Sequence, residues 1–403
     1  MVAQNQRKKI TVATTISASG SVKSGGSNVM SGLYGRMSEY FDIQLIYLAP
    51  YTEKYKSARL NSNLVEITIP KTLEHDKQTR ALATELKAST LYDVGIIYYL
   101  KYTPEYYKEL SYSIRNSDVV IVDRPYLYDA VKKFINGRPV IQRSHNIEYY
   151  FRKSNIPESI EQRRVLGDLF DAEKECCNQC DINFSCSELD MKTMIEMYKT
   201  DKRKIVFMPN GVDCDSNPFI SFQKRRERKK IYRLDKRKIA VFIGGGHRPN
   251  VEACEVIIKV AAYCSDMAFV IMGDVCNHLV NMKRTANVIL VGNVSEDTRK
   301  FIFSVADVAL NPMFSGSGSN VKMFDYMSMG VPVISTLFGA RGISDSSGII
   351  LANTIEEIIK VINEFKLEER EEAILKNRNM VIEQYDWRII ADKAKDCINK
   401  VLG

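Results

Sequence analysis

Short apolar runs alternate with longer amphipathic segments along the first half of the chain. The runs are rich in β-branched residues, which is typical of buried strands, and the segments between them have helical patterns. Strands separated by helices predict a parallel, doubly wound sheet. The predicted strands are KITVATTI (9–16), FDIQLIYLA (41–49), LVEITIP (64–70), SDVVIVDRP (117–125), RPVIQRSHN (138–146), DINFSCS (181–187) and KIVFMPNGVD (204–213).

The same alternation starts again in the second half. We therefore predict an α/β protein with two Rossmann-like domains, residues 1–213 and 237–385. A basic linker, 214–236, joins them, and a C-terminal helix, 386–403, is able to pack back on the first domain. The strands predicted for the second domain are KIAVFIGGG (238–246), MAFVIMGD (267–274), NVILVGNV (287–294), VADVAL (305–310), VPVIST (331–336) and SSGIILAN (346–353).

Composition agrees with two globular domains. The chain has 403 residues, 45% of them hydrophobic, which fits two domains of about 200 residues. No apolar run approaches the roughly 18 residues that a membrane span requires, and the start MVAQNQRKKI lacks a signal peptide's apolar core. We expect a cytoplasmic protein whose nine cysteines are reduced thiols.

The positive charge is concentrated in one region. The net charge is +8, and KRRERKK (224–230) and RLDKRK (233–238) carry much of it. A nucleic-acid-binding surface would be broader, so we do not expect nucleic acid as a partner. Two interpretations stay open: a solvated helix and linker, or a peripheral surface for an anionic membrane, which is worth roughly 1 kcal/mol per basic residue.

The segment NPMFSGSGSNVKMFDYMSMGVPVIST (311–336) has the pattern of a strand end, a glycine loop, a helix and a further strand. Ser319 is a good N-cap for a helix that starts at about Asn320. The free amides of this helix start, with Lys322 in its first turn, form an anion site. Asp325 follows on the same face, roughly 9 Å along the axis from Ser319. This spacing fits a nucleoside diphosphate; the alternative is an ordinary turn with a solvated Lys322–Asp325 pair.

Two further glycine loops follow the first strand of each half. Gly25 and Gly26 open a helix in one, and Gly244 and Gly245 precede Arg248 in the other. Ligands bind at these strand ends in open α/β sheets. Neither loop has the complete G-x-G-x-x-G pattern, so a nicotinamide cofactor is not favoured.

His145 ends a predicted strand in RSHNIEYY and is followed by Glu148. Catalytic groups collect at such strand ends, but a histidine that only packs or caps there has the same pattern. The position alone leaves both interpretations open.

The ordered set of motifs resembles the retaining glycosyltransferases of family four. These have the GT-B architecture, two facing Rossmann-like domains with the active site in the cleft. The motifs that carry the resemblance are GGSNVM and SHNIEY in the first half, and PNGVD, FIGGGHRPN, MGD, VGNV, ADVALNP and GSGSNVKMFDYMSMGVPVIST in the second.

The resemblance implies roles for individual residues. Val294 would contact the nucleobase and Asp325 the ribose, while Ser317 stands where the family has a glutamate that faces the sugar. Gly25 and Gly26 match the family's glycine loop in the first domain. The residues that would bind the donor's diphosphate are Gly244, Gly245, Arg248, Ser319, Asn320 and Lys322.

The implied activity is retaining transfer of a hexose from a nucleotide diphosphate sugar to a glycan, lipid-linked or other cell-surface glycoconjugate acceptor. Arg248 and Lys322 would stabilise the leaving diphosphate without a metal or a further cofactor, and His145 would orient the sugar or acceptor. The first domain would recognise the acceptor. Two alternatives remain: a non-catalytic nucleotide-binding partner of another glycosyltransferase, and a GT-B-fold nucleotide-sugar epimerase.

Overall fold

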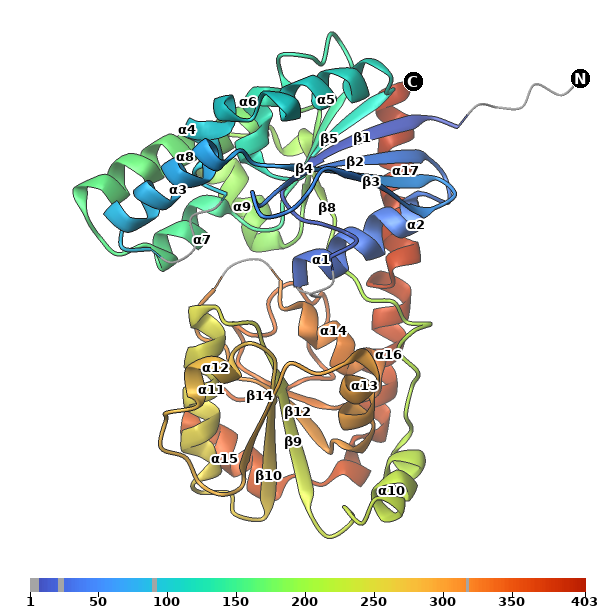
Figure 1. The fold of residues 1–403 in the computed structure, drawn as a ribbon. Helices are drawn as coiled ribbons and strands as arrows, with labels where there is room; N and C mark the ends of the chain where they lie inside the picture. Colours follow the sequence, from blue (N-terminus) through green and yellow to red (C-terminus); the bar gives the residue numbers. More distant parts are fainter. Residues whose placement is uncertain (1–6, 21–24, 89–92, 317–318) are drawn as a thin grey trace, which may run out of the picture. The chain divides into compact units, whose positions relative to one another are not determined.

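The computed structural model describes residues 7–20, 25–88, 93–316 and 319–403, which form two compact units (Figure 1). The first unit contains the described residues up to Asn210, together with Ser319 and Trp387–Gly403. The second contains Gly211–Gly316 and Asn320–Asp386. The chain therefore passes from one unit to the other after Asn210 and returns after Asp386.

The first unit is built on a sheet of eight strands in the order β3-β4-β2-β1-β5-β6-β7-β8. Neighbours pair in parallel except β3 and β4, which are antiparallel. The predicted parallel sheet is confirmed, and β3 is an addition. The strands are β1 (Lys9–Thr14), β2 (Asp42–Ala49), β3 (Lys56–Asn61), β4 (Leu64–Pro70), β5 (Val119–Val122), β6 (Val140–Arg143), β7 (Ile182–Ser185) and β8 (Ile205–Phe207).

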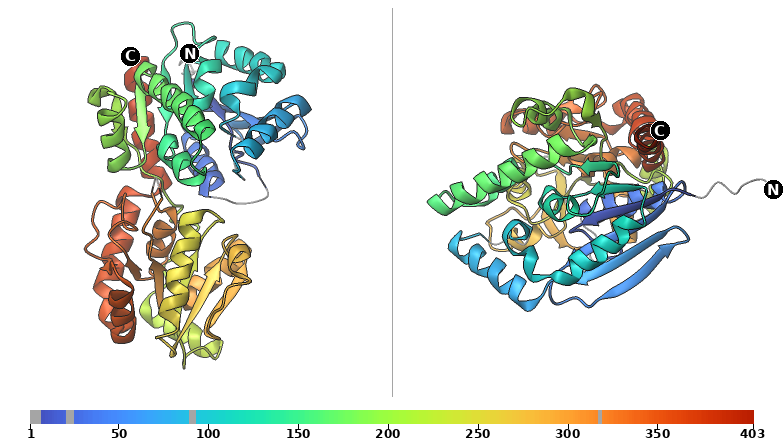
Figure 2. Two further views of the ribbon diagram at one scale, coloured as in Figure 1. Left: turned by 90° about the vertical axis from the view of Figure 1, so that its left-hand side faces the viewer. Right: turned by 90° about the horizontal axis from the view of Figure 1, so that it is seen from above.

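Helices cover both faces of this sheet (Figures 1 and 2). One apolar core lies under α3 (Leu73–Glu85), α5 (Pro104–Arg115) and α8 (Ile160–Gln179). The opposite core lies under the π-helix η1 (Met30–Tyr34) and α17 (Trp387–Leu402). The remaining helices of the unit are α1 (Gly25–Val29), α2 (Gly35–Met37), α4 (Ile96–Tyr99), α6 (Tyr128–Val131), α7 (Glu148–Asn155) and α9 (Glu188–Glu196).

The C-terminal helix α17 is fixed to the first unit by close packing. A Cβ atom built on Gly32 would lie 2.2 Å from the indole nitrogen of Trp387, so only glycine leaves room for this ring. Ile390, Ala391 and Ala394 continue the buried face of α17. The last residues of the chain therefore complete the core of the first unit.

The second unit has six parallel strands in the order β11-β10-β9-β12-β13-β14. Counted within this unit the order is 3-2-1-4-5-6, the doubly wound arrangement of dinucleotide-binding folds. The strands are β9 (Lys238–Ile243), β10 (Met267–Met272), β11 (Val288–Gly292), β12 (Val308–Asn311), β13 (Val333–Ser335) and β14 (Ile350–Leu351).

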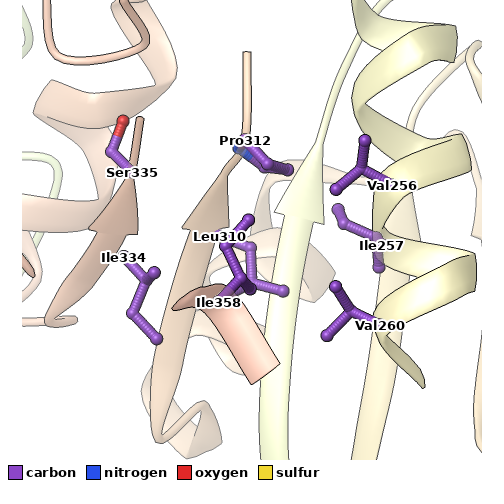
Figure 3. A pocket seen from close by; sticks show the side chains of 8 residues that line it. All are labelled: Val256, Ile257, Val260, Leu310, Pro312, Ile334, Ser335 and Ile358. Atoms are coloured by element: carbon purple, nitrogen blue, oxygen red, sulfur yellow. The ribbon is translucent and has the colours of Figure 1, made fainter. Parts of the chain in front are cut away.

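Two cores again lie on the two faces of the sheet. α11 (Arg248–Ala261) and α15 (Ile355–Glu364) cover one face, and α13 (Glu296–Val305), α14 (Val321–Ser328) and α16 (Glu371–Gln384) contribute to the other. Figure 3 shows an apolar crevice where α11 meets β12 and β13. It has no room for a water molecule, so it belongs to the core packing.

The basic segment contains a helix, α10 (Phe222–Ile231), with two different faces. Arg225 is buried and donates hydrogen bonds to the carbonyls of Ala306 at 2.7 Å and Gly330 at 3.0 Å. Lys229 is buried against Asp307. The interpretation of this helix as fully solvated is therefore wrong at these two positions, where the cations attach α10 to the second unit.

None of the described helices is both long and apolar enough to cross a membrane. All nine cysteines lie among the described residues and none forms a disulfide, although Cys176 Sγ and Cys180 Sγ are 3.9 Å apart.

Candidate functional site

The strand order of the second unit defines its ligand-binding edge. β9 lies between β10 and β12, so the direction of winding changes between β9 and β12. The loop after β9 contains Gly244 and Gly245, and the segment after β12 leads to α14. The two glycine loops predicted from the sequence therefore leave adjacent parallel strands at the same edge of the sheet.

Hydrogen bonds to the end of β10 and the segment after it hold the loop after β9 in one conformation. The amide of Gly244 donates to Met272 O at 3.0 Å, and its carbonyl accepts from Val275 N at 3.2 Å. Gly273 has φ +96°, and a Cβ atom there would lie 2.3 Å from Gly244 O. Asn250 closes the other side by donating to Gly245 O at 3.0 Å. A ligand would meet a preformed loop in the second unit.

Lys322 points its ammonium group at this loop. Its Nζ donates to Asn250 Oδ1 at 2.7 Å and lies 4.1 Å from the centre of the Phe242 ring. Among the residues that the structure describes, no carboxylate lies within ion-pair distance of it. Burial of the charge, with the positive charge of Arg341 nearby, lowers the pKa of Lys322 to about 7. The site thus contains a cation that is half-buried as a residue and lacks an anion.

Arg248 occupies a different environment. It is the first residue of α11, its side chain is 73% exposed, and it forms an ion pair with Glu252 at 2.9 Å. Glu252 also accepts a hydrogen bond from Ser315 Oγ at 2.7 Å. Arg248 would have to leave Glu252 to contact a diphosphate, whereas Lys322 is already in place.

The start of α14 differs by one residue from the expectation. The helix begins at Val321 and its N-cap is Asn320, not Ser319. Asn320 makes no side-chain cap because its Nδ2 donates to Gly339 O at 2.7 Å. Ser319 Oγ instead accepts from Asn210 at 2.9 Å, and Ser317 lies outside the described residues.

Asp325 is engaged by two partners from other elements. Its Oδ1 lies 3.1 Å from the guanidinium of Arg299 and accepts from Asn217 Nδ2, also at 3.1 Å. The alternative of a solvated Lys322–Asp325 pair is therefore wrong, since the two side chains have separate partners. Val294 follows β11 and is half-buried against the core of the second unit.

The first unit has its own change of winding, between β1 and β5. Gly25 and Gly26 open α1 after β1, and the π-helix η1 follows at once. Such π-helical turns occur frequently at functional sites. β5 ends immediately before Asp123, and β6 ends two residues before His145.

His145 is bound on both ring nitrogens. Its Nε2 lies 2.8 Å from Asp123 Oδ2, and its Nδ1 lies 3.3 Å from the guanidinium of Arg143. Asp123 also accepts from Tyr34 at 3.1 Å and from Thr14 at 3.1 Å. Burial lowers the pKa of His145 to about 4, so the ring is neutral with its proton on Nε2. This arrangement positions the imidazole and leaves neither nitrogen for a ligand.

A second buried cluster begins at Glu148, at the start of α7. Its carboxylate contacts Arg124, Tyr126 and Arg152. Arg152 in turn lies 3.4 Å from Asp93. Every charge in this cluster has an opposite charge beside it.

No group of three His, Cys, Asp or Glu side chains placed to hold a metal ion occurs in the described parts of the chain. The candidate ligand-binding site of the second unit consists of the glycine loop after β9, Lys322 and the start of α14.

The sequence did not single out several residues of these sites. Asn250 joins the glycine loop to Lys322, Arg299 holds Asp325, and Asp123 holds His145. Asp123 could have been found, because it ends a buried strand in VVIVDRP as His145 does. The partners of Lys322 and Asp325 depend on tertiary contacts that no local pattern predicts.

Comparison with known proteins gives a family match for the second unit and a fold for the whole chain. Residues 237–365 match the family model described as Glycosyl transferases group 1. This part of the chain is therefore similar to group 1 glycosyl transferases, and the fold of the chain is that of the GT-B proteins. A comparison with curated protein sequences gives no match.

Solved structures with the same fold extend over nearly the whole chain. HepE of Anabaena in complex with UDP-glucose has 9% identity and a TM-score of 0.69, covering 97% of this chain and 99% of that one. Sucrose-phosphate synthase of Thermosynechococcus elongatus has 11% identity and a TM-score of 0.74, covering 98% and 99%. An E. coli structure described as trehalose-6-phosphate bound with UDP-2-fluoro glucose has 10% identity and a TM-score of 0.68, covering 98% and 99%.

Proposed function

We propose that this protein transfers a sugar from a nucleotide diphosphate sugar to an acceptor hydroxyl. The observation that carries the proposal is Lys322, a cation without a described carboxylate partner beside a preformed glycine loop. Burying such a charge costs free energy unless an anion compensates it. A diphosphate placed at the loop after β9 would supply that anion.

We assign the nucleoside part of the donor to residues farther along the same edge of the sheet. Asp325 follows Lys322 on α14, and the contacts that the described residues Arg299 and Asn217 make with it are both to Oδ1. We propose that the other oxygen accepts from a ribose hydroxyl and that Val294 contacts the base. UDP-glucose in the HepE complex supports a uridine nucleotide as the first donor to test.

We infer a retaining, metal-independent mechanism. In glycosyl transfer the leaving diphosphate gains negative charge as the sugar–oxygen bond breaks, and a fixed cation stabilises this charge more in the transition state than in the ground state. Lys322 and the amides at the start of α14 would supply that stabilisation, with Arg248 joining after it leaves Glu252. A phosphate oxygen would accept the acceptor's proton, which suits the engaged nitrogens of His145. The imidazole then positions the sugar or the acceptor.

The test is a panel of UDP-, GDP- and TDP-sugars assayed for binding, donor hydrolysis and transfer to glycan and lipid-linked acceptors. Lys322→Ala should lose binding and turnover, and Arg248→Ala should lose less because its side chain is exposed and paired. Lys283→Ala is the matched control, because Lys283 is exposed in a segment that precedes β11. Equal rates in Lys322→Ala and the parent would refute the role of this cation.

The same panel separates the alternatives. Nucleotide binding without turnover on any acceptor would indicate a non-catalytic partner of another glycosyltransferase. A changed sugar without an acceptor would indicate an epimerase. A glycosylated acceptor supports the transferase and gives the anomeric configuration that the retaining mechanism predicts.

We also propose that the exposed face of α10 binds an anionic membrane surface from the cytoplasmic side. Four basic residues, Lys224, Arg226, Arg228 and Lys230, are exposed there. Ile231 and Tyr232, 73% and 53% exposed, follow directly and offer apolar surface to a lipid interface.

Replacing the four exposed basic residues with serine should weaken binding to vesicles that contain phosphatidylserine, by roughly 1 kcal/mol per residue near the surface. Arg225 and Lys229 must be retained because they hold the helix in the unit. Unchanged vesicle binding in the fourfold variant would leave a solvated helix.

A further inference from the structure

A groove of about 650 Å³ lies between α7 and α8 in the first unit. Its volume is within the roughly 300–1,000 Å³ typical of sites for small organic ligands. The residues that line it come from the first and second turns of α7, the segment that follows and the first half of α8. Neither His145 nor Glu148 lines this groove, so it is separate from the interactions described for them.

Two aromatic rings form a wall of the groove. Tyr149 and Phe170 pack edge to face, with ring centres 5.6 Å apart and an angle of 78°. Tyr198 supports Phe170 from the buried side at 5.1 Å. Its hydroxyl donates to Glu173 at 2.6 Å, and Glu173 accepts the amide of Tyr149 at 3.0 Å. The wall is therefore fixed before any ligand binds.

Gly167 keeps the groove open. It lies in the interior of α8, a helix of 20 residues, where glycine is less stable than alanine. It is exposed, and a Cβ atom built on it would meet no heavy atom within 4 Å. Close packing therefore does not explain the glycine. Because Gly167 lines the groove, any larger side chain there would occupy the ligand's space.

The rim of the groove is polar and electrically balanced. Lys153 and Arg163 are positively charged, and Glu158 and Asp171 are negatively charged, so the formal charges of the rim sum to zero. A phosphate or nucleotide would gain no net attraction from such a rim. A hydroxyl-rich neutral molecule finds both donors and acceptors there, with an aromatic surface for its apolar face.

We propose that this groove is a binding subsite for a neutral oligosaccharide, the acceptor of the transfer reaction. The proposal rests on the proposed function and names the acceptor class that this function lacks. The wall residue Tyr149 follows Glu148 directly and lies four residues after His145, so one short segment of the first unit carries both His145 and a wall of the groove.

The experiment titrates the protein against fluorescently labelled neutral oligosaccharides of hexose and N-acetylhexosamine units, in the absence of nucleotide. The decisive variant is Gly167→Trp, which fills the groove from an exposed position. Gly167→Ala keeps most of the space. Lys174→Trp puts the same indole on the same side of α8, about 10 Å farther along the axis and outside the lining residues.

We expect the parent to bind at least one of these oligosaccharides. Gly167→Trp should lose about tenfold or more in affinity, equal to about 1.4 kcal/mol, while Gly167→Ala and Lys174→Trp stay within about twofold. Parental binding by Gly167→Trp, or binding of uronic-acid oligosaccharides alone, would overturn the proposal. So would a complete absence of binding.

Failure of the proposed function would look different. UDP-glucose, GDP-mannose and TDP-glucose are titrated against the same variants in a separate series. Loss of nucleotide-sugar binding in the parent would refute the donor site and leave the oligosaccharide result standing. Retained nucleotide-sugar binding with no oligosaccharide binding would refute the groove alone.

Discussion

The two units share a sheet topology, but the charges at the ligand-binding edge are paired differently in each. In each, the direction of winding changes beside the first strand and places loops at one edge of a parallel sheet. In the first unit the charges at this edge are compensated: Arg143 and Arg124 attract the Asp123 carboxylate, and Glu148 pairs with Arg124 and Arg152. In the second unit Lys322 has an amide and an aromatic ring as neighbours, without a described carboxylate.

The shared topology does not determine how the charges at this edge are paired, and that pairing affects what each edge can bind. A compensated cluster fixes side chains in place and presents a shaped surface, whereas an uncompensated cation lowers its free energy by binding an anion. This contrast supports our proposal that the charged donor binds to the second unit and a neutral acceptor to the first.

The largest expected effect comes from breaking the compensated cluster. Asp123→Asn removes the carboxylate that His145, Tyr34 and Thr14 share, and removes a negative charge that attracts Arg143. Leaving the buried charge of Arg143 without this compensation costs about 3–5 kcal/mol. Urea unfolding should show this loss in the first unit. Nucleotide-sugar binding by the folded variant should stay parental, and a loss of it would contradict the separation of the two sites.

Replacing the uncompensated cation, Lys322, should raise the stability of the apo protein, whereas Asp123→Asn lowers it. Lys322→Met removes the charged hydrogen bond that we propose between Lys322 and the diphosphate, worth about 2–3 kcal/mol, or about 30–150-fold in affinity. The apo protein should become more stable because a desolvated charge is lost. Calorimetry and thermal unfolding check the two effects, with Lys283→Met as the control. A lower Tm for Lys322→Met would contradict the account.

The pH dependence of stability provides a third contrast. Burial lowers the pKa of His145 from 6.5 to about 4, so the unfolded chain binds more protons than the folded one between these values. Stability of the first unit should therefore rise between pH 4 and pH 6.5, by at most about 3 kcal/mol from this group. His145→Gln should flatten that rise. An identical profile in the variant would show that other groups control it.

The smallest effect concerns the groove. Gly167→Ala should stabilise α8 by about 0.5–1 kcal/mol, because the new methyl group enters open space and the unfolded chain loses conformational freedom. Thermal unfolding checks this. A destabilised Gly167→Ala variant would mean that the position is packed in solution and that the groove is closed.

Much of the fold follows from local patterns. The β-branched runs predicted the parallel strands of both sheets, because strands buried on both faces leave a strong apolar signal. β3 escaped, since KSARLN is polar and mostly exposed at the sheet edge. In the basic segment, Arg225 and Lys229 stand four residues apart on the buried face of α10, but a run of cations hides that periodicity.

The candidate site was predictable in part. Glycine loops and a lysine in a first helical turn mark an anion site in any sequence. The hydrogen-bond partner of each side chain is a residue distant along the chain, such as Asn250 for Lys322 and Asp123 for His145. Charge balance therefore had to come from the structure.

The most direct test of the account is proton uptake on nucleotide-sugar binding. Lys322 has a pKa of about 7 in the free protein, so at pH 8 it is mostly neutral, and a bound diphosphate would raise that pKa and recharge the amine. Calorimetry at pH 8 in two buffers of different ionisation enthalpy measures the uptake with UDP-glucose, whose diphosphate does not itself titrate there. The account predicts uptake approaching one proton in the parent and none in a Lys322→Met variant that still binds at high ligand concentration. Binding without proton uptake in the parent would contradict it.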